Sequence, residues 1–216
     1  MRKGVFIVLE GGEGAGKSVQ ARILTERLRE AGYRVTSTRE PGGTRIGEQI
    51  RAITHDPENV DLHPKAEAYL MAAARAQHVA ETIAPALEAD RIVLCDRFVD
   101  SSVVYQGFGR QLGEDTIRNL NALAVNDVMP DLVIILNVPP ATGIQRRRES
   151  AKANDRLDLQ GKDFYERVYN GYLTLAKKDP ARYLVIDATA PIETVSEHIW
   201  AQVEKFLTIR NGSKKD

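Results

Sequence analysis

Five short segments of the chain are apolar, and each is followed by a turn or by polar residues. The runs 4–10, 91–96 and 131–138 are almost continuously apolar, which is typical of strands buried on both faces of a sheet. The segment 33–38 alternates polar and β-branched residues, and the segment 183–187 reads YLVID. The pattern therefore predicts five strands at these positions.

Segments with helical periodicity separate these strands. Between the first two strands, apolar residues at Ala21, Leu24 and Leu28 recur at the spacing of one helix face. The same reading predicts helices at residues 17–31, 45–53, 62–89, 116–126, 141–148, 162–178 and 191–207, with a bend at Pro85. Alternating strands and helices predict an α/β fold, in which a five-stranded parallel sheet carries helices on both faces. Ligands of such sheets bind beyond the carboxyl ends of the strands.

The composition fits one ordinary globular domain. The chain has 216 residues, of which 43% are hydrophobic and 28% charged, and we expect residues 1–210 to form the domain and residues 211–216 a mobile tail. Lys and Arg balance Asp and Glu at 30 each, which argues against nucleic acid or a membrane surface as a partner. No apolar run is long enough to span a bilayer, and the N-terminus lacks the pattern of a signal peptide, so we expect a cytoplasmic protein.

A glycine-rich turn follows the first predicted strand and carries the clearest chemical signal. It matches the pattern G-x-x-x-x-G-K-[ST] and consists of Gly11, Gly12, Glu13, Gly14, Ala15, Gly16, Lys17 and Ser18. Its glycines let successive N–H groups face phosphate oxygens, and a helix N-terminus follows. In such a phosphate loop the lysine reaches the β- and γ-phosphates and the serine hydroxyl ligates Mg²⁺. Its place between a strand and a helix makes nucleotide binding the expected property.

Arginines near the strand ends narrow the class of nucleotide-binding protein. The second and third predicted strands end at or beside Arg39 and Arg97, and arginine suits phosphate oxygens and the charge that develops in phosphoryl transfer. No D-x-x-G motif follows the third predicted strand, and the sequence has no N-K-x-D motif for guanine recognition, so a switch GTPase is not expected. Further arginines lie in or beside the polar stretch 149–158, at Arg146, Arg147, Arg148 and Arg156. Two anion-binding regions on one sheet indicate two phosphorylated ligands, as a nucleotide kinase requires.

Four motifs together resemble one family, the thymidylate kinases. Beside the phosphate loop, residues 38–44 (TREPGGT) resemble its R-E-P-G-G segment, and residues 96–107 resemble its D-R-[YFH]-x-x-S-x-x-x-Y-Q-G stretch. Residues 155–158 (DRLD) resemble the D-R-x-[DE] of the family's lid. The resemblance covers residues 10 to about 158, and it implies the P-loop kinase fold with a lid at about 146–158. It also implies a kinase that transfers the γ-phosphate of ATP to dTMP, giving dTDP for dTTP biosynthesis, in a homodimer.

The resemblance implies a role for each matching residue. Arg39, Arg51 and Arg97 would hold the dTMP phosphate. Arg75, Ser102 and Gln106 would recognise thymine, and Tyr105 would pack against the deoxyribose. Glu10 and Asp96, beside the phosphate loop, would position Mg²⁺ and its waters, and Ser18 would ligate the ion. Arg148 and Arg156 would close over the phosphates from the lid and act with Lys17, Arg97 and Asp96 in catalysis, while Arg146 would lie on the adenine side of ATP.

The chain departs from the family pattern at two positions, and other readings stay open. Met71 replaces the phenylalanine that stacks on thymine in many members, and the phosphate loop has no arginine, as in the bacterial type whose lid supplies the charge. Arg51 and Arg75 could instead be helix-surface residues, Tyr105 a core residue and Asp96 a helix cap. The rival functions are a kinase for another nucleoside monophosphate, a deoxynucleoside kinase with Glu40 as base, and a switch or DNA-handling ATPase. We read the four histidines as structural or surface residues.

Overall fold

The structure is a computed structural model, and it describes residues 4–150 and 155–212. Within them one sheet has the strand order β2-β3-β1-β4-β5, with every neighbouring pair parallel. Its strands are β1 (Val5–Glu10), β2 (Val35–Arg39), β3 (Ile92–Asp96), β4 (Leu132–Asn137) and β5 (Tyr183–Asp187). This sheet confirms the predicted fold class.

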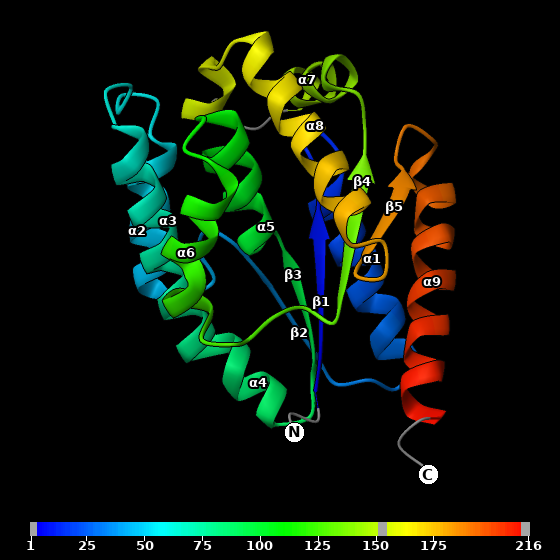
Figure 1. Cartoon of the computed structure of the whole chain (residues 1–216). Coiled ribbons are helices and arrows are strands. Elements are labelled where there is room, and N and C mark those ends of the chain that lie inside the picture. Colours follow the sequence, from blue (N-terminus) through cyan, green and yellow to red (C-terminus); the bar gives the residue numbers. More distant parts are fainter. Residues whose placement is uncertain (1–3, 151–154, 213–216) are drawn as a thin grey trace.

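Helices connect the strands and pack on both faces of the sheet (Figure 1). The α-helices are α1 (Lys17–Glu30), α2 (Arg45–His55), α3 (Pro64–His78), α4 (Ala84–Glu88), α5 (Val99–Ser102), α6 (Glu114–Val125), α7 (Pro140–Glu149), α8 (Lys162–Lys178) and α9 (Ile192–Gly212). Two π-helical segments, η1 (Val79–Ile83) and η2 (Val103–Gly109), and one 3₁₀ helix, η3 (Arg156–Leu159), complete the described elements.

The core lies in two layers because successive side chains of a strand point to opposite faces. In β1, Phe6 and Val8 pack with residues of α3, α5, α6 and α8. Ile7 and Leu9 pack on the other face, with residues of α1 and α9. All four of these side chains are fully buried, which explains why the strand reads as a continuous apolar run.

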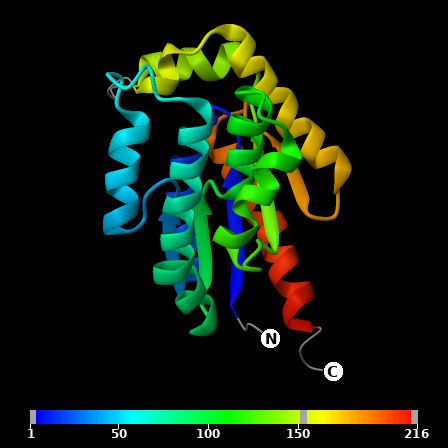
Figure 2. The ribbon, with the colours of Figure 1, turned by 60° about the vertical axis from the view of Figure 1, so that its left-hand side comes forward.

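The carboxyl ends of the strands meet beneath one group of connections. Figures 1 and 2 show α7 and the beginning of α8 at the top of the molecule, above the strand ends, while the described ends of the chain lie at the bottom. The phosphate loop leaves β1 at this upper edge and leads into α1. The fold therefore gathers the candidate residues on one side of the sheet.

Two stretches of helix differ from the prediction. The sequence pattern assigned no element to residues 99–109, where α5 and η2 form one continuous helical segment. The long helix begins at Pro64 and widens into η1 just before Pro85. Proline has no N–H to donate, so a local change in the hydrogen-bond pattern accommodates it within the helix.

The predicted domain bounds stay a prediction. Helix α9 continues to Gly212, and residues 213–216 of the expected tail lie outside the described residues, as do residues 151–154 of the expected lid. Within residues 4–150 and 155–212, no helix has both the length and the apolar character that crossing a bilayer requires.

The phosphate loop packs backbone to backbone against α7. A side chain at Gly14, where φ is +66°, would collide with the carbonyl oxygen of Gly143. A side chain at Gly143 would collide with the carbonyl oxygen of Glu13. Neither contact leaves room for a methyl group, and backbone atoms cannot swing aside as a flexible side chain can. Gly143, which no sequence motif identifies, therefore sets how closely α7 approaches the loop.

We predict that Gly143→Ala lowers the free energy of unfolding by about 1–3 kcal/mol, because the added methyl group overpacks this contact. Urea unfolding measures the change. Gly12→Ala is the matched control, because its added carbon meets nothing within 4 Å and its backbone is not left-handed. Equal stability of Gly143→Ala and wild type would contradict the close packing of α7 on the loop.

Candidate active site

The phosphate loop holds its lysine through its own carbonyl groups. Lys17 Nζ donates to Gly11 O at 3.1 Å and to Gly12 O at 2.8 Å. Burial, together with the nearby charge of Arg97, lowers the pKa of Lys17 to about 8, although neighbouring carboxylates oppose the shift. Its ammonium group is thus fixed at the mouth of a loop whose N–H groups suit phosphate.

Ser18 and Asp96 meet directly beside the loop. Ser18 Oγ donates to Asp96 Oδ2 at 2.7 Å, which links the first turn of α1 to the end of β3. A hydroxyl and a carboxylate are hard oxygen ligands of the kind that Mg²⁺ prefers. These two residues therefore fit the metal role that the sequence suggests for them.

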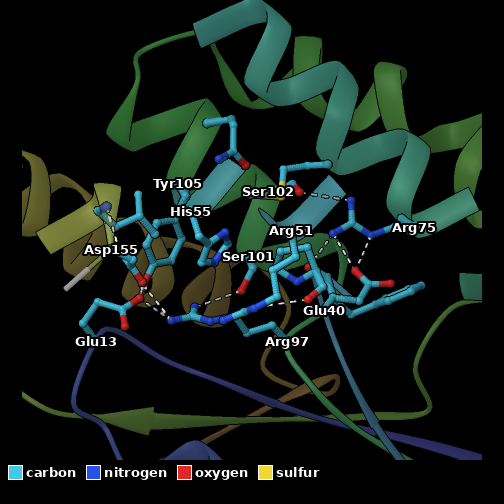
Figure 3. A pocket seen from close by; sticks show the side chains of 15 residues that line it. Glu13, Glu40, Arg51, His55, Arg75, Arg97, Ser101, Ser102, Tyr105 and Asp155 are labelled. Carbon is cyan, nitrogen blue, oxygen red and sulfur yellow. Dashed lines mark hydrogen bonds and ion pairs between the residues drawn. The ribbon is translucent and has the colours of Figure 1, made fainter. Parts of the chain in front are cut away.

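Arg97 lies at the centre of the strand-end cluster. It has φ +73°, an uncommon backbone conformation for a residue with a side chain. Its guanidinium forms an ion pair with Glu13 at 2.5 Å and donates to Gly11 O, Ser101 Oγ and Tyr105 OH. Figure 3 shows Arg97 reaching toward Glu13 and Tyr105 at one end of the group. The contacts fix Arg97 against the phosphate loop.

Glu13 is ionised because of these neighbours. Burial alone would raise the pKa of Glu13, but the charges of Arg97 and Lys17 and a hydrogen bond from Tyr105 lower the pKa to about 2. The Tyr105 hydroxyl donates to Glu13 at 2.9 Å. Glu13 therefore links the phosphate loop to Arg97, directly after β3, and to Tyr105 of η2.

Glu10 lies in a different setting from the one expected. Its carboxylate is fully buried and accepts hydrogen bonds from Phe98 N, Ser101 N, Ser101 Oγ and Tyr172 OH, at 2.6–3.1 Å. Burial raises the pKa of Glu10. These four donors occupy the lone pairs of both oxygens, so Glu10 supports the start of α5 and has no lone pair left for direct contact with a metal ion.

Arg39 and Arg51 line one cavity together with the phosphate loop, Asp96 and Arg97. We call it the phosphate cavity. Arg39 is exposed and pairs with Glu48 at 2.8 Å, while the half-buried Arg51 donates to Pro41 O at 3.1 Å. The structure therefore brings the three arginines expected at the acceptor phosphate to the loop expected at the donor phosphates.

A second cavity continues inward from the phosphate cavity. This inner cavity is lined by Glu13, Glu40, Pro41, Arg51, His55, Met71, Arg75, Arg97, Phe98, Ser101, Ser102, Tyr105, Gln106, Asp155 and Leu157. The two cavities share Glu13, Glu40, Arg51, Arg97 and Asp155. All five residues expected at the nucleoside end, from Met71 to Gln106, line it. One ligand could therefore place a phosphate at the shared wall and a base in the inner cavity.

Arg75 is the most constrained residue of the inner cavity. It is 3% exposed, pairs with Glu40 at 2.8 Å, and donates to Ser102 Oγ, Asn121 Oδ1 and Phe98 O. Figure 3 shows Arg75, Glu40 and Ser102 grouped at the end opposite Glu13. Arg75 is thus no surface residue, and Glu40, held also by His78 Nδ1 at 3.0 Å, is not free to act as a base.

The arginines of the expected lid lie in different settings. Arg146 donates to Ala188 O and Thr189 O, and lines an outer cavity with Gly14, Ala15, Gly16 and residues 188–192. Arg148 is exposed. Arg156 is buried, donates to Thr54 O and Glu67, and lines neither the phosphate cavity nor the inner cavity. Arg156 therefore anchors η3 to α2 and α3, away from the expected phosphate position.

Several residues at the site carry no motif that sequence reasoning used. His55 lines the inner cavity, and burial, helped by the charge of Arg51, lowers the pKa of His55 to about 3. Asn121 and Glu67 bond the recognition residues from other helices. A histidine at a helix end and polar residues on helix faces give no periodic signal, so only the fold reveals these contacts. No group of three potential metal ligands occurs among the described residues.

The comparison with known families decides which of the open readings holds. A family model described as thymidylate kinase matches residues 9–199. The chain belongs to the thymidylate kinase family. It phosphorylates dTMP to dTDP with ATP as the donor. The rival readings, a kinase for a different acceptor or a switch ATPase, are thereby excluded.

Individual relatives agree with the family model. The thymidylate kinase of Thermomicrobium roseum is 49% identical over 202 residues, covering 94% of this chain and 95% of the relative. That of Pelotomaculum thermopropionicum is 46% identical over 205 residues, covering 95% of each. The crystal structure of the thymidylate kinase from Ehrlichia chaffeensis has a TM-score of 0.75 at 32% identity and covers 93% of this chain and 98% of that one.

The charge of Glu13 predicts a pH dependence of stability. Because its pKa falls from 4.5 to about 2 on folding, the unfolded chain binds more protons between these values. Its contribution is therefore present above about pH 4.5 and is lost as the pH falls toward 2. We expect Glu13→Gln to lack this part of the acid destabilisation, measured by urea unfolding between pH 2.5 and 6. The exposed Glu58→Gln is the control, and parallel curves for all three proteins would contradict the prediction.

Proposed function

We propose that dTMP lies across the two connected cavities, with its phosphate among Arg39, Arg51 and Arg97 and its thymine in the inner cavity. The observation that carries the proposal is the shared wall, because Arg51 and Arg97 line both cavities. Arginine forks match phosphate oxygens. The partly buried Met71 supplies an apolar wall there, and its thioether suits an aromatic face.

The ATP phosphates then bind in the phosphate loop, with Lys17 at the β- and γ-phosphates. Adenine lies in the outer cavity, where Arg146 is held by carbonyl groups of residues 188 and 189. The exposed Arg148 reaches the transferring phosphate from the lid. Arg156, which is buried against Glu67, anchors the lid instead of contacting phosphate.

We propose Mg²⁺ as the metal cofactor, held by Ser18 and Asp96 without Glu10. Their oxygens lie 2.7 Å apart beside the phosphate loop. The ion would neutralise phosphate charge. The acceptor needs no general base, because its second pKa is about 6 and the phosphate is already mostly dianionic near pH 7. The work of the protein is to align the two phosphates and neutralise charge through Lys17 and Arg97.

We expect ADP formation with ATP and Mg²⁺ to be fastest with dTMP among dTMP, dUMP, dCMP, dGMP, UMP and thymidine. This result would support the proposal that the inner cavity binds the thymine base. Faster turnover of another monophosphate would keep the phosphate cavity and contradict the base assignment, with Met71 the first residue to exchange for phenylalanine. Thymidine turnover equal to that of dTMP would contradict the role of the three arginines.

We expect Asp96→Asn to raise the Mg²⁺ concentration needed for half-maximal turnover about tenfold or more, because the change removes the charge of a proposed metal ligand. Turnover measured against free Mg²⁺ tests this. Asp90→Asn is the control, since Asp90 lies in a turn with φ +54°, a conformation that asparagine adopts readily. An unchanged Mg²⁺ requirement in Asp96→Asn would remove Asp96 from the metal site.

We propose that the enzyme works in the cytoplasm, where its donor ATP is made.

We further propose that two copies of the chain associate through α3 and α6. Tyr69 on α3 is 65% exposed and Leu123 on α6 is 89% exposed, although both are apolar in character. These two helices pack against each other, and a large exposed apolar side chain on each is typical of a contact surface. A second copy that buries this surface would explain the exposure.

We expect Leu123→Glu to shift the protein from dimer to monomer in analytical ultracentrifugation, because it places a charge in the proposed contact. Ile209→Glu is the control. Ile209 is 61% exposed on α9, which lies on the opposite side of the sheet from α6 (Figure 1). Equal sedimentation of wild type and Leu123→Glu would contradict this interface.

A further inference from the structure

Glu67 of α3 is a buried carboxylate that no catalytic motif includes. Its side chain is 1% exposed. One oxygen, Oε1, accepts a hydrogen bond from Gln106 Nε2 at 2.6 Å. The other, Oε2, accepts one from Arg156 and lies 3.1 Å from Arg110 Nη2. A single carboxylate thus contacts the base end of the inner cavity and the anchor of the lid.

Glu67 is held in its ionised form. Burial would raise its pKa, but hydrogen bonds from Arg156 and Gln106 and the charge of Arg110 outweigh burial and lower the pKa. An ionised carboxylate can only accept hydrogen bonds. Gln106 must therefore turn its NH₂ group toward Glu67, and the amide cannot be reversed without setting two acceptors against each other.

The fixed amide has a consequence on its other side. Gln106 is 2% exposed and lines the inner cavity, so its carbonyl oxygen is available as an acceptor there. The Watson–Crick edge of thymine carries a donor, N3–H, between two carbonyl oxygens. In cytosine the same ring position is an acceptor. A carbonyl oxygen held toward N3 therefore attracts thymine and repels cytosine.

We propose that Glu67 is a positioning residue for base selection, which fixes the Gln106 amide so that its carbonyl oxygen faces the N3–H of thymine. The inference rests on the proposed place of thymine beside Gln106. Through Arg156 the same carboxylate also holds η3, which lies at the C-terminal end of the proposed lid segment, against α2 and α3. Base selection and the anchor of the lid therefore depend on one side chain.

The test compares kcat/KM for dTMP with kcat/KM for dCMP in Glu67→Gln. An amide at position 67 both donates and accepts, so it no longer dictates the orientation of Gln106. We expect the dTMP-to-dCMP ratio to fall about tenfold or more, as for the loss of one well-placed buried hydrogen bond. A folded Glu67→Gln protein with the wild-type ratio would overturn the proposal.

Two further variants separate the proposal from its neighbours. Arg110→Gln removes another charge beside Glu67 but leaves the contact with Gln106, so we expect lower thermal stability and an unchanged ratio. If the dTMP-to-dCMP ratio falls as much in Arg110→Gln as in Glu67→Gln, the ion pairs of Glu67 act on the ratio only through stability, and the proposal is overturned. Gln106→Ala tests the proposed base site itself. If Gln106→Ala lowers the ratio and Glu67→Gln does not, the base site stands and the role of Glu67 fails; if Gln106→Ala leaves the ratio unchanged, the base site fails.

The wild-type protein offers a measurement that does not depend on the folding of a variant. Neutron diffraction from crystals grown with dTMP in D₂O shows the deuterium atoms of the Gln106 amide. We expect them on the atom that faces Glu67, with the carbonyl oxygen toward thymine N3. The reverse orientation would overturn the proposal.

Discussion

The ion pair between Glu13 and Arg97 is the interaction on which the site depends. It joins the phosphate loop, which follows β1, to the first residue after β3. Both groups are largely removed from water, and removal of one partner would leave the other charge buried without compensation. The Tyr105 hydroxyl donates to the same carboxylate, so the loop, the strand end and η2 form one unit. The surface at which we propose that the two nucleotides meet is therefore held together by contacts within the protein itself.

Buried carboxylates hold two further arginines, Arg75 and Arg156, in the same manner. Glu40 holds Arg75 in the inner cavity, and Glu67 holds Arg156 at the start of η3. Glu10 supports the start of α5 through backbone and hydroxyl donors. Phosphoryl transfer requires cationic groups that are already oriented when charge develops, because reorientation during the reaction would cost free energy. The ion pair with Glu13 supplies that orientation for Arg97.

Local sequence signals identify the sheet and the phosphate loop, because continuous apolar runs and a glycine pattern are short-range features. They also place Asp96 and Arg97 at a strand end, where ligands of parallel sheets bind. The partners of Glu10 and Arg156 were not predictable in this way. Their contacts join residues about 90 positions apart or more. In addition, the 99–109 segment is rich in β-branched residues and glycine, which do not favour a helix, so the sequence did not predict the helix whose N–H groups bond Glu10. Residues that belong to no motif, such as Glu67, can be recognised as part of the site only from the packing of the helices.

The most direct test of the account is the affinity of Arg97→Gln for dTMP and for thymidine, measured by calorimetry. The two ligands differ only in the phosphate, so thymidine serves as the internal control for the nucleoside cavity. If Arg97 contacts the acceptor phosphate, the affinity for dTMP falls about tenfold to a hundredfold, as expected for a charged hydrogen bond, while the affinity for thymidine is unchanged. An equal loss for both ligands, or no loss for dTMP, would contradict the placement of the acceptor phosphate at Arg97.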